Sequence, residues 1–305
     1  MPNEMNNILT LESDAAVETQ KSKEDLIWHE ITNAYRTRRI LTGMLGGIEK
    51  LEGGATITIV YYKNFRVVIP ITEMMINLVE DAAHNYGELS LRQNKIVNTM
   101  LGCEIDFIIK GLDSKERSIV ASRKDAMLKK RQIFYFDQDS SGTPKVYPDR
   151  VVQARVISVA EKVVRAEIFG VETSIPARDL SFDWLGDARE RFHVGDHILV
   201  RIQEVKAEDP EHISVRADVK TVEGDTSKAN LALCKVQGKY AGTVEDIHNG
   251  TVFVRLQIGV NAIAHTCYDS RTVGKKDEVS FVVTHIDSER NVALGIITRI
   301  IRQNL

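Results

Sequence analysis

The chain has 305 residues, of which 43% are hydrophobic and 27% are charged, and its net charge at pH 7 is −3. This length predicts two or three domains of a soluble protein, and no apolar run approaches the ~18 residues that a membrane-spanning helix needs. The nearly neutral charge excludes a nucleic-acid binder that works by electrostatic attraction alone.

The first 22 residues are polar, acidic and poor in aromatic side chains, so we expect them to form a flexible tail. They lack a basic region followed by an apolar core, so we expect a cytoplasmic protein rather than a secreted one. The cysteines at 103, 234 and 267 are widely spaced and odd in number, which indicates neither a disulfide framework nor a zinc site.

Helical and strand patterns alternate along the first third of the chain. Apolar spacing predicts a helix over residues 24–40, with Glu24 and Asp25 near the positive end of its dipole. Beyond it, apolar and polar residues alternate between glycines, which is typical of strands. A helical pattern over 74–102 predicts an insertion, and another over 122–136 predicts a closing helix.

A repeated pattern decides the expected fold. Segments starting at residues 100, 194 and 273 each contain a glycine, a polar turn, alternating apolar residues, an aspartate and a second apolar strand. We therefore expect a mainly β protein of three tandem five-stranded OB-fold barrels with added helices. The predicted parts are a tail (1–22), a helix plus repeat one (23–136), a linker (137–147), repeat two (148–220), a linker (221–236) and repeat three (237–305).

The strands of repeat three resemble the RNA-binding repeat of the ribosomal protein S1 family. The matching stretches are GTVEDI (242–247), TVFVRL (251–256), AIAHTC (262–267) and VTHIDSERNVALG (283–295). Repeat one is similar through GLDSKERSIVASRKDA (111–126), and repeat two mainly through VGDHILVRI (194–202) and SIPARDL (174–180).

The resemblance implies an RNA-binding face made of strand-two aromatic residues, a histidine ending strand three, and an aspartate and an arginine in the turn between strands four and five. Alternation in TVFVRL also places Arg255 on the same face as Phe253, and a basic run lies near the end of repeat one. The predicted RNA-binding residues are Phe253, Arg255, His265, Asp287 and Arg290 in repeat three, and Tyr61, Tyr62, Phe65, Asp113, Arg117, Arg123 and Lys124 in repeat one.

Several positions depart from the family pattern or have a second interpretation. Gly250 occupies the position of the family's first aromatic residue, and Pro70 and Pro176 stand where repeats one and two would carry the histidine. Phe253 could instead belong to the core, His265 could be an ordinary surface residue, and the basic run could be a solvated helix face. Only one of the adjacent Tyr61 and Tyr62 can line a groove. Repeat two could be purely structural.

These patterns favour binding of single-stranded RNA or mRNA through stacking and phosphate contacts, with little sequence specificity. The resemblance implies a role in translation and association with the small ribosomal subunit. The alternative is a scaffold of OB-type barrels that docks on a ribosome or another ribonucleoprotein. The sequence contains no P-loop, nucleophile elbow or H-E-x-x-H pair, so we expect no enzyme, cofactor or metal site. The sequence leaves the oligomeric state open.

Overall fold

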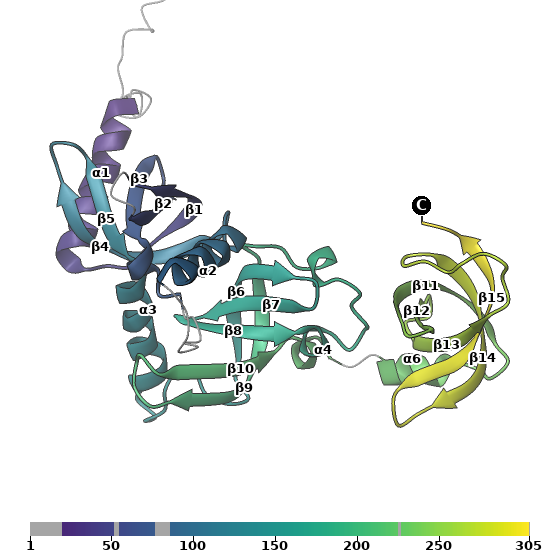
Figure 1. Ribbon diagram of the computed structural model, residues 1–305. Coiled ribbons are helices and arrows are strands. Elements are labelled where there is room, and N and C mark those ends of the chain that lie inside the picture. Colours follow the sequence, from purple (N-terminus) through teal and green to yellow (C-terminus); the bar gives the residue numbers. More distant parts are fainter. Residues whose placement is uncertain (1–19, 52–54, 77–85, 225–226, 305) are drawn as a thin grey trace, which may run out of the picture. The chain divides into compact units, whose positions relative to one another are not determined.

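The fold is mainly β and contains three five-stranded sheets (Figure 1). The computed structural model describes residues 20–51, 55–76, 86–224 and 227–304. The chain divides into two compact units, Met1–Met127 and Leu128–Leu305. The first unit contains one sheet and the second contains two, which confirms the prediction of three five-stranded repeats.

The first unit is a closed barrel preceded by a helix. Its sheet has the order β1-β2-β3-β5-β4, and β3 pairs with β5 in parallel to close it. The elements are α1 (Gln20–Thr37), β1 (Leu41–Lys50), β2 (Thr56–Tyr62), β3 (Phe65–Pro70), the 3-10 turn η3 (Ile71–Met74), α2 (Tyr86–Thr99), β4 (Glu104–Asp113) and β5 (Ser118–Ser122).

Helix α1 begins earlier than the sequence pattern predicts. It starts at Gln20, so Glu24 and Asp25 do not lie in its first turn. They instead form ion pairs with Arg117, at 3.8 Å and 2.8 Å respectively. Residues 1–19 of the expected tail lie outside the described residues, as do 77–85 of the expected helical insertion.

The second unit begins with a sheet that backbone pairing does not close. Its order is β10-β9-β6-β7-β8, so β8 and β10 are edges, in contrast to the two closed barrels. The Thr173 hydroxyl still bridges these edges, donating to the Val215 carbonyl oxygen at 2.7 Å. The strands are β6 (Val151–Ala160), β7 (Val163–Ile168), β8 (Val171–Pro176), β9 (His197–Ala207) and β10 (Ile213–Asp218), with the helical turns α4 (Ala177–Leu180) and η5 (Ala188–Glu190) between β8 and β9.

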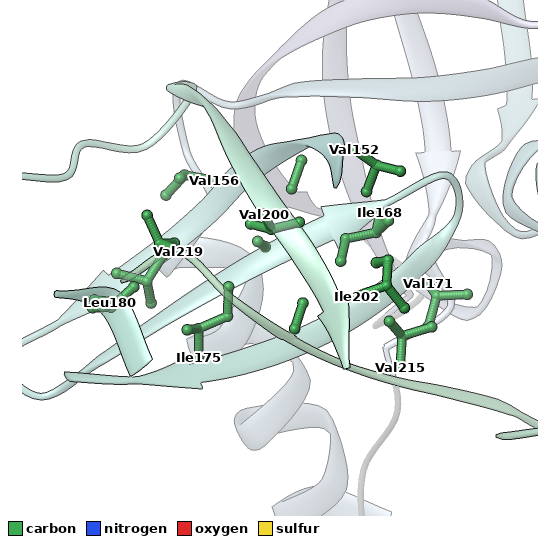
Figure 2. Packing of buried hydrophobic residues seen from close by; sticks show 14 of the residues in the cluster. Val152, Val156, Ile168, Val171, Ile175, Leu180, Val200, Ile202, Val215 and Val219 are labelled. Atoms are coloured by element: carbon green, nitrogen blue, oxygen red, sulfur yellow. The ribbon is translucent and has the colours of Figure 1, made fainter. Parts of the chain in front are cut away.

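The core of this sheet consists mainly of small and β-branched side chains, which come from all five strands (Figure 2). Val156, Ile168, Ile175, Val200 and Ile202 are fully buried in it. Because β-branched residues fit a pleated, half-buried surface, this composition explains why the segment folds as a sheet despite its incomplete closure.

The end of the segment predicted to close repeat one packs in repeat two. Helix α3 (Arg123–Arg131) continues into a π-helical turn, η4 (Gln132–Phe136). Within this turn Tyr135 is buried and donates to the Ile168 carbonyl oxygen at 2.7 Å, while Phe134 stacks on Phe169 with ring centroids 4.0 Å apart. The η4 turn therefore belongs to the core of repeat two, which the expected boundary at residue 136 does not anticipate.

The last sheet is again a closed barrel, in the order β11-β12-β13-β15-β14. Two short helices precede it, and Leu231 and Cys234, at the end of the second, are buried in the barrel core. The expected linker over 221–236 is thus partly helical. The elements are α5 (Lys220–Glu223), α6 (Ser227–Leu233), β11 (Lys239–His248), β12 (Thr251–Leu256), β13 (Asn261–Cys267), β14 (Glu278–Asp287) and β15 (Val292–Arg302).

Candidate nucleic-acid interface

The strands β12 and β13 carry the residues predicted to bind RNA in repeat three. Val254 and Leu256 point into the core, and Phe253, one position along from Val254, is half-buried outside it. Phe253 pairs with Ile263 across the two strands, and the Thr251 hydroxyl lies 3.3 Å from Nδ1 of the exposed His265. Phe253 and His265 therefore share the outward face of two adjacent strands.

One end of this face is in contact with repeat two. Trp184, in the loop after α4, meets Phe253 edge to face with ring centroids 5.0 Å apart. Arg255 pairs with Asp183 at 2.6 Å. The Asn261 side-chain amide donates to the Phe182 carbonyl oxygen at 3.1 Å. The loop over residues 181–186 thus covers part of the predicted RNA-binding face, while His265 stays exposed.

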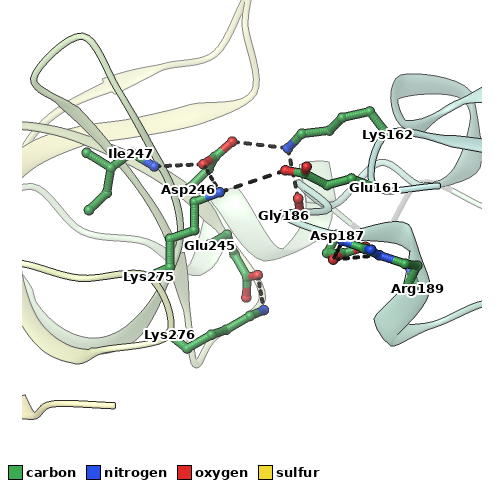
Figure 3. Close-up of polar contacts among 10 residues, drawn as sticks. All are labelled: Glu161, Lys162, Gly186, Asp187, Arg189, Glu245, Asp246, Ile247, Lys275 and Lys276. Atoms are coloured by element: carbon green, nitrogen blue, oxygen red, sulfur yellow. Dashed lines mark hydrogen bonds and ion pairs between the residues drawn. The ribbon is translucent and has the colours of Figure 1, made fainter. Parts of the chain in front are cut away.

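An ion-pair network holds the turn between β6 and β7, which carries Glu161 and Lys162, against β11 and the loop before β14 (Figure 3). Asp246 accepts from Lys275 at 2.8 Å and from Lys162 at 3.1 Å, and its carboxylate also accepts from the Ile247 backbone N–H. Burial opposes ionisation of Asp246, but these hydrogen bonds outweigh it and lower its pKa to about 2. Asp246 is therefore a stable anion between two lysines.

A second ion-pair group lies beside the first. Lys276 bonds Glu245 of its own barrel at 2.6 Å and Glu190 of repeat two at 2.7 Å. Burial disfavours the Lys276 ammonium, yet the two carboxylates raise its pKa above the usual value. The backbones also approach closely, because a Cβ at Gly186 would collide with the Glu245 carbonyl oxygen. Only glycine fits there without a shift of one repeat relative to the other.

A cavity of about 410 Å³ lies at this contact between the two repeats. The aromatic side chains of Phe182, Trp184 and Phe253 line it, all of them half-buried. Of these three, the sequence pattern assigned only Phe253 to a site. The stretch SFDWLG (181–186), which places two aromatic residues in a loop directly after SIPARDL, was the signal that could have identified the others.

The aspartates of the three turns between strands four and five have a structural role. In each turn one carboxylate oxygen accepts backbone N–H groups two and three residues further on. The distances are 2.8 and 3.3 Å for Asp113, 2.8 Å twice for Asp209, and 3.1 and 3.0 Å for Asp287. Side chains that bond their own turn in this way favour its formation, which accounts for the repeated aspartate without RNA. Arg290 is exposed beside Asp287.

The aromatic candidates of repeat one divide between core and surface. Tyr62 is buried, and its hydroxyl donates to Glu30 at 2.8 Å. Phe65 is also buried, and its ring lies 5.6 Å from that of Trp28, so α1 packs on the barrel through this pair. Tyr61 is 50% exposed and is the one aromatic of the three that faces solvent.

The basic candidates of repeat one are mostly engaged within the protein. Arg123 is fully buried and donates to the Met74 carbonyl oxygen at 3.0 Å, so its prediction as a phosphate contact is wrong. The cause is its position as the first residue of α3, facing the turn that ends in Met74. Arg117 contacts the acidic residues of α1, and Lys124 is half-buried.

Within the described residues, no cluster of three or more histidine, cysteine or acidic side chains is placed to hold a metal ion. None of the described helices is long and apolar enough to cross a membrane.

Residues 145–216, which correspond to repeat two, match the family model described as the S1 RNA binding domain. The chain is 21% identical over 287 residues to small ribosomal subunit protein bS1 of Coxiella burnetii, an alignment that covers 91% of this chain and 47% of that protein. For the bS1 protein of Neisseria meningitidis the identity is 22% over 291 residues, covering 91% and 46%. The chain thus spans about half the length of these curated relatives.

A solved structure, the a/eIF2alpha–aDim2p–rRNA complex from Pyrococcus horikoshii, is similar at a TM-score of 0.23 and 14% identity, covering 29% of this chain and 60% of that chain. Similarity at this level has no bearing on function.

Proposed function

We propose that this chain, which carries an S1 RNA-binding domain in its second repeat, binds single-stranded RNA by base stacking and phosphate contact. The observation that carries the proposal is the outward face of β12 and β13, where Phe253 and His265 lie on adjacent strands of an OB-type barrel. This is the surface on which OB folds bind oligonucleotides.

The chemistry of the face fits unpaired bases. Single-stranded RNA exposes flat base faces, and an aromatic or imidazole ring stacks on them with little dependence on sequence. Each stacked base contributes about 1–3 kcal/mol, so one barrel with two such rings binds weakly and several repeats together bind more tightly. Tyr61, which is exposed on the first barrel, is a further stacking candidate.

The relatives named small ribosomal subunit protein bS1 suggest the cellular role. We propose a non-catalytic function in the cytoplasm, in which the chain binds mRNA and associates with the small ribosomal subunit during translation. A protein scaffold is the second candidate, because the loop over residues 181–186 already covers part of the stacking face and the net charge is only −3.

The test is fluorescence anisotropy of the full chain with a labelled, unstructured RNA of about 15 nucleotides, long enough for at least one OB fold. We expect the affinity to fall with salt at a log–log slope of about −0.7 for each phosphate neutralised. His265→Ala should weaken binding, whereas Tyr268→Ala, which removes a 70% exposed aromatic side chain outside the strands, should not. An anisotropy that stays flat even at low salt would refute RNA binding and favour the scaffold.

A further inference from the structure

The cavity between repeats two and three combines features that ordinary packing does not require. Three half-buried aromatic rings surround a space of about 410 Å³, within the ~300–1,000 Å³ typical of ligand sites. Trp184 stands at 89° to Phe253, so the edge of one ring meets the face of the other and the two rings do not cover each other's full surfaces. Flat apolar surface therefore remains for the ring of a ligand.

The polar side chains of the cavity favour an anion beside that ring. Three cations and two carboxylates line it: Lys162, Arg178, Lys220, Asp183 and Asp246. Both carboxylates are already neutralised, Asp183 by Arg255 and Asp246 by Lys162 and Lys275.

Arg178 is the cation best placed to meet a ligand. Its side chain is 81% exposed, and its ion pair with Asp179 is long, at 3.9 Å. Lys220 lies deeper, bonded to Asp179 at 2.9 Å and 5.9 Å from the centre of the Phe182 ring. The positive charge thus lies at the rim next to an aromatic wall, which is the arrangement that a nucleotide needs.

We propose that this cavity is a composite RNA subsite, built jointly by repeats two and three, which takes one unstacked nucleobase and places Arg178 against an adjacent phosphate. The inference rests on the proposed function, since it extends the place where the same single-stranded RNA is held from Phe253 to the loop of repeat two. It also assigns a binding role to repeat two, whose strands carry neither the stacking aromatic residues nor the histidine.

The two tryptophans of the chain make a direct test possible. In a Trp28→Phe background Trp184 is the remaining tryptophan, and a base that stacks on it quenches its fluorescence. We expect saturable quenching by the unstructured 15-nucleotide RNA, with the same midpoint as the anisotropy titration. Inorganic polyphosphate of equal charge, which has no bases, should leave the emission unchanged.

Variants then separate stacking from phosphate contact. Trp184→Ala should weaken RNA binding about 5- to 150-fold, from the ~1–3 kcal/mol of one stacked base at 1.4 kcal/mol per tenfold. Because Trp184 also contacts Phe253, Arg178→Gln is the second variant, expected to reduce the salt slope by about 0.7 without altering the fold. Arg302→Gln, which changes an exposed arginine outside the cavity, is the matched control and should leave the slope unchanged.

The outcomes distinguish the subsite from the general function. If anisotropy shows RNA binding while Trp184 emission, Trp184→Ala and Arg178→Gln show no change, the subsite is refuted and RNA binding on the β12–β13 face stands. If polyphosphate quenches Trp184 as RNA does, the cavity binds anions without stacking a base, and the proposal is again overturned. If no RNA binds at low salt, both proposals are wrong.

Discussion

Neutralising Asp246 should weaken the contact between repeats two and three. Its carboxylate lies between Lys275 at 2.8 Å and Lys162 at 3.1 Å, and Asp246→Asn removes the charge while keeping a side-chain oxygen that can accept from the Ile247 N–H. The pKa is lowered from 3.8 to about 2, which at about 1.36 kcal/mol per pKa unit corresponds to an upper limit of about 2 kcal/mol for all the bonds to this carboxylate, of which only the one from Lys162 crosses between the repeats. Because solvent screens the half-exposed lysines, we expect Asp246→Asn to weaken the contact by about 1 kcal/mol. This corresponds to a roughly fivefold change in the equilibrium between docked and separated repeats.

The lowered pKa of Asp246 also determines how the contact between repeats two and three depends on pH. Because the pKa of Asp246 is lower in the folded, docked state, its contribution is fully present above about pH 4 and is lost as the pH falls toward 2. In the Trp28→Phe background the emission of Trp184, which contacts Phe253 across the two repeats, reports on docking. We expect a red shift between about pH 4 and pH 2, and in Asp246→Asn a red-shifted emission already at neutral pH.

The control is Glu289→Gln, which removes a carboxylate from an exposed turn of the same barrel. The reasoning is wrong if Asp246→Asn keeps the neutral-pH emission and the acid transition of the unsubstituted protein. Added salt supplies an independent check, because the Debye length falls from about 10 Å at 0.1 M to about 3 Å at 1 M salt, so these half-exposed ion pairs and the docked state should weaken at high salt.

Three further substitutions test the packing of the sheets, each by denaturant unfolding of the full chain. Arg131→Met should destabilise repeat two by about 2–4 kcal/mol, because the buried guanidinium donates to three backbone carbonyl oxygens; an unchanged midpoint would contradict this. Gly295→Ala should destabilise the third barrel by about 1–3 kcal/mol, since a Cβ would collide with the Val282 carbonyl oxygen. An unchanged unfolding midpoint would mean that β14 shifts easily to make room. Tyr62→Phe should cost about 1 kcal/mol by removing the hydrogen bond to Glu30, and a larger loss would point to a packing change.

The strand pattern of the chain could be predicted because it depends on local alternation. Valine and isoleucine at every second position, interrupted by glycine and by an aspartate turn, identified the β4–β5, β9–β10 and β14–β15 hairpins as equivalents. Closure of each barrel could not be predicted in this way. Whether the third and fifth strands of a repeat pair is decided by long-range geometry, and in repeat two a Thr173 side-chain hydrogen bond joins β8 to β10, with no backbone ladder between them.

The residues of the candidate site were predictable only in part. Alternation placed Phe253 outside the core, but nothing local to TVFVRL indicates that Trp184, almost seventy positions earlier, lies against it. The sequence shows Arg123 within a basic run, and its burial depends on a turn far away in the chain that ends in Met74. Contacts between repeats are tertiary information, so the cavity could not be found from one repeat at a time.

The contact between repeats two and three also bears on modularity. Proteins built from OB repeats are often pictured as independent units on flexible linkers, in which a ligand that spans two units must first bring them together and lose their rotational freedom. Here the close approach at Gly186 and the lysine–carboxylate pairs Lys162–Asp246 and Lys276–Glu190 already hold repeats two and three together, so an RNA crossing both meets a preorganised surface. A fragment that ends near residue 224 would lose this advantage. A foreign barrel that replaced repeat three would also need the residues of repeat three that contact the 181–186 loop.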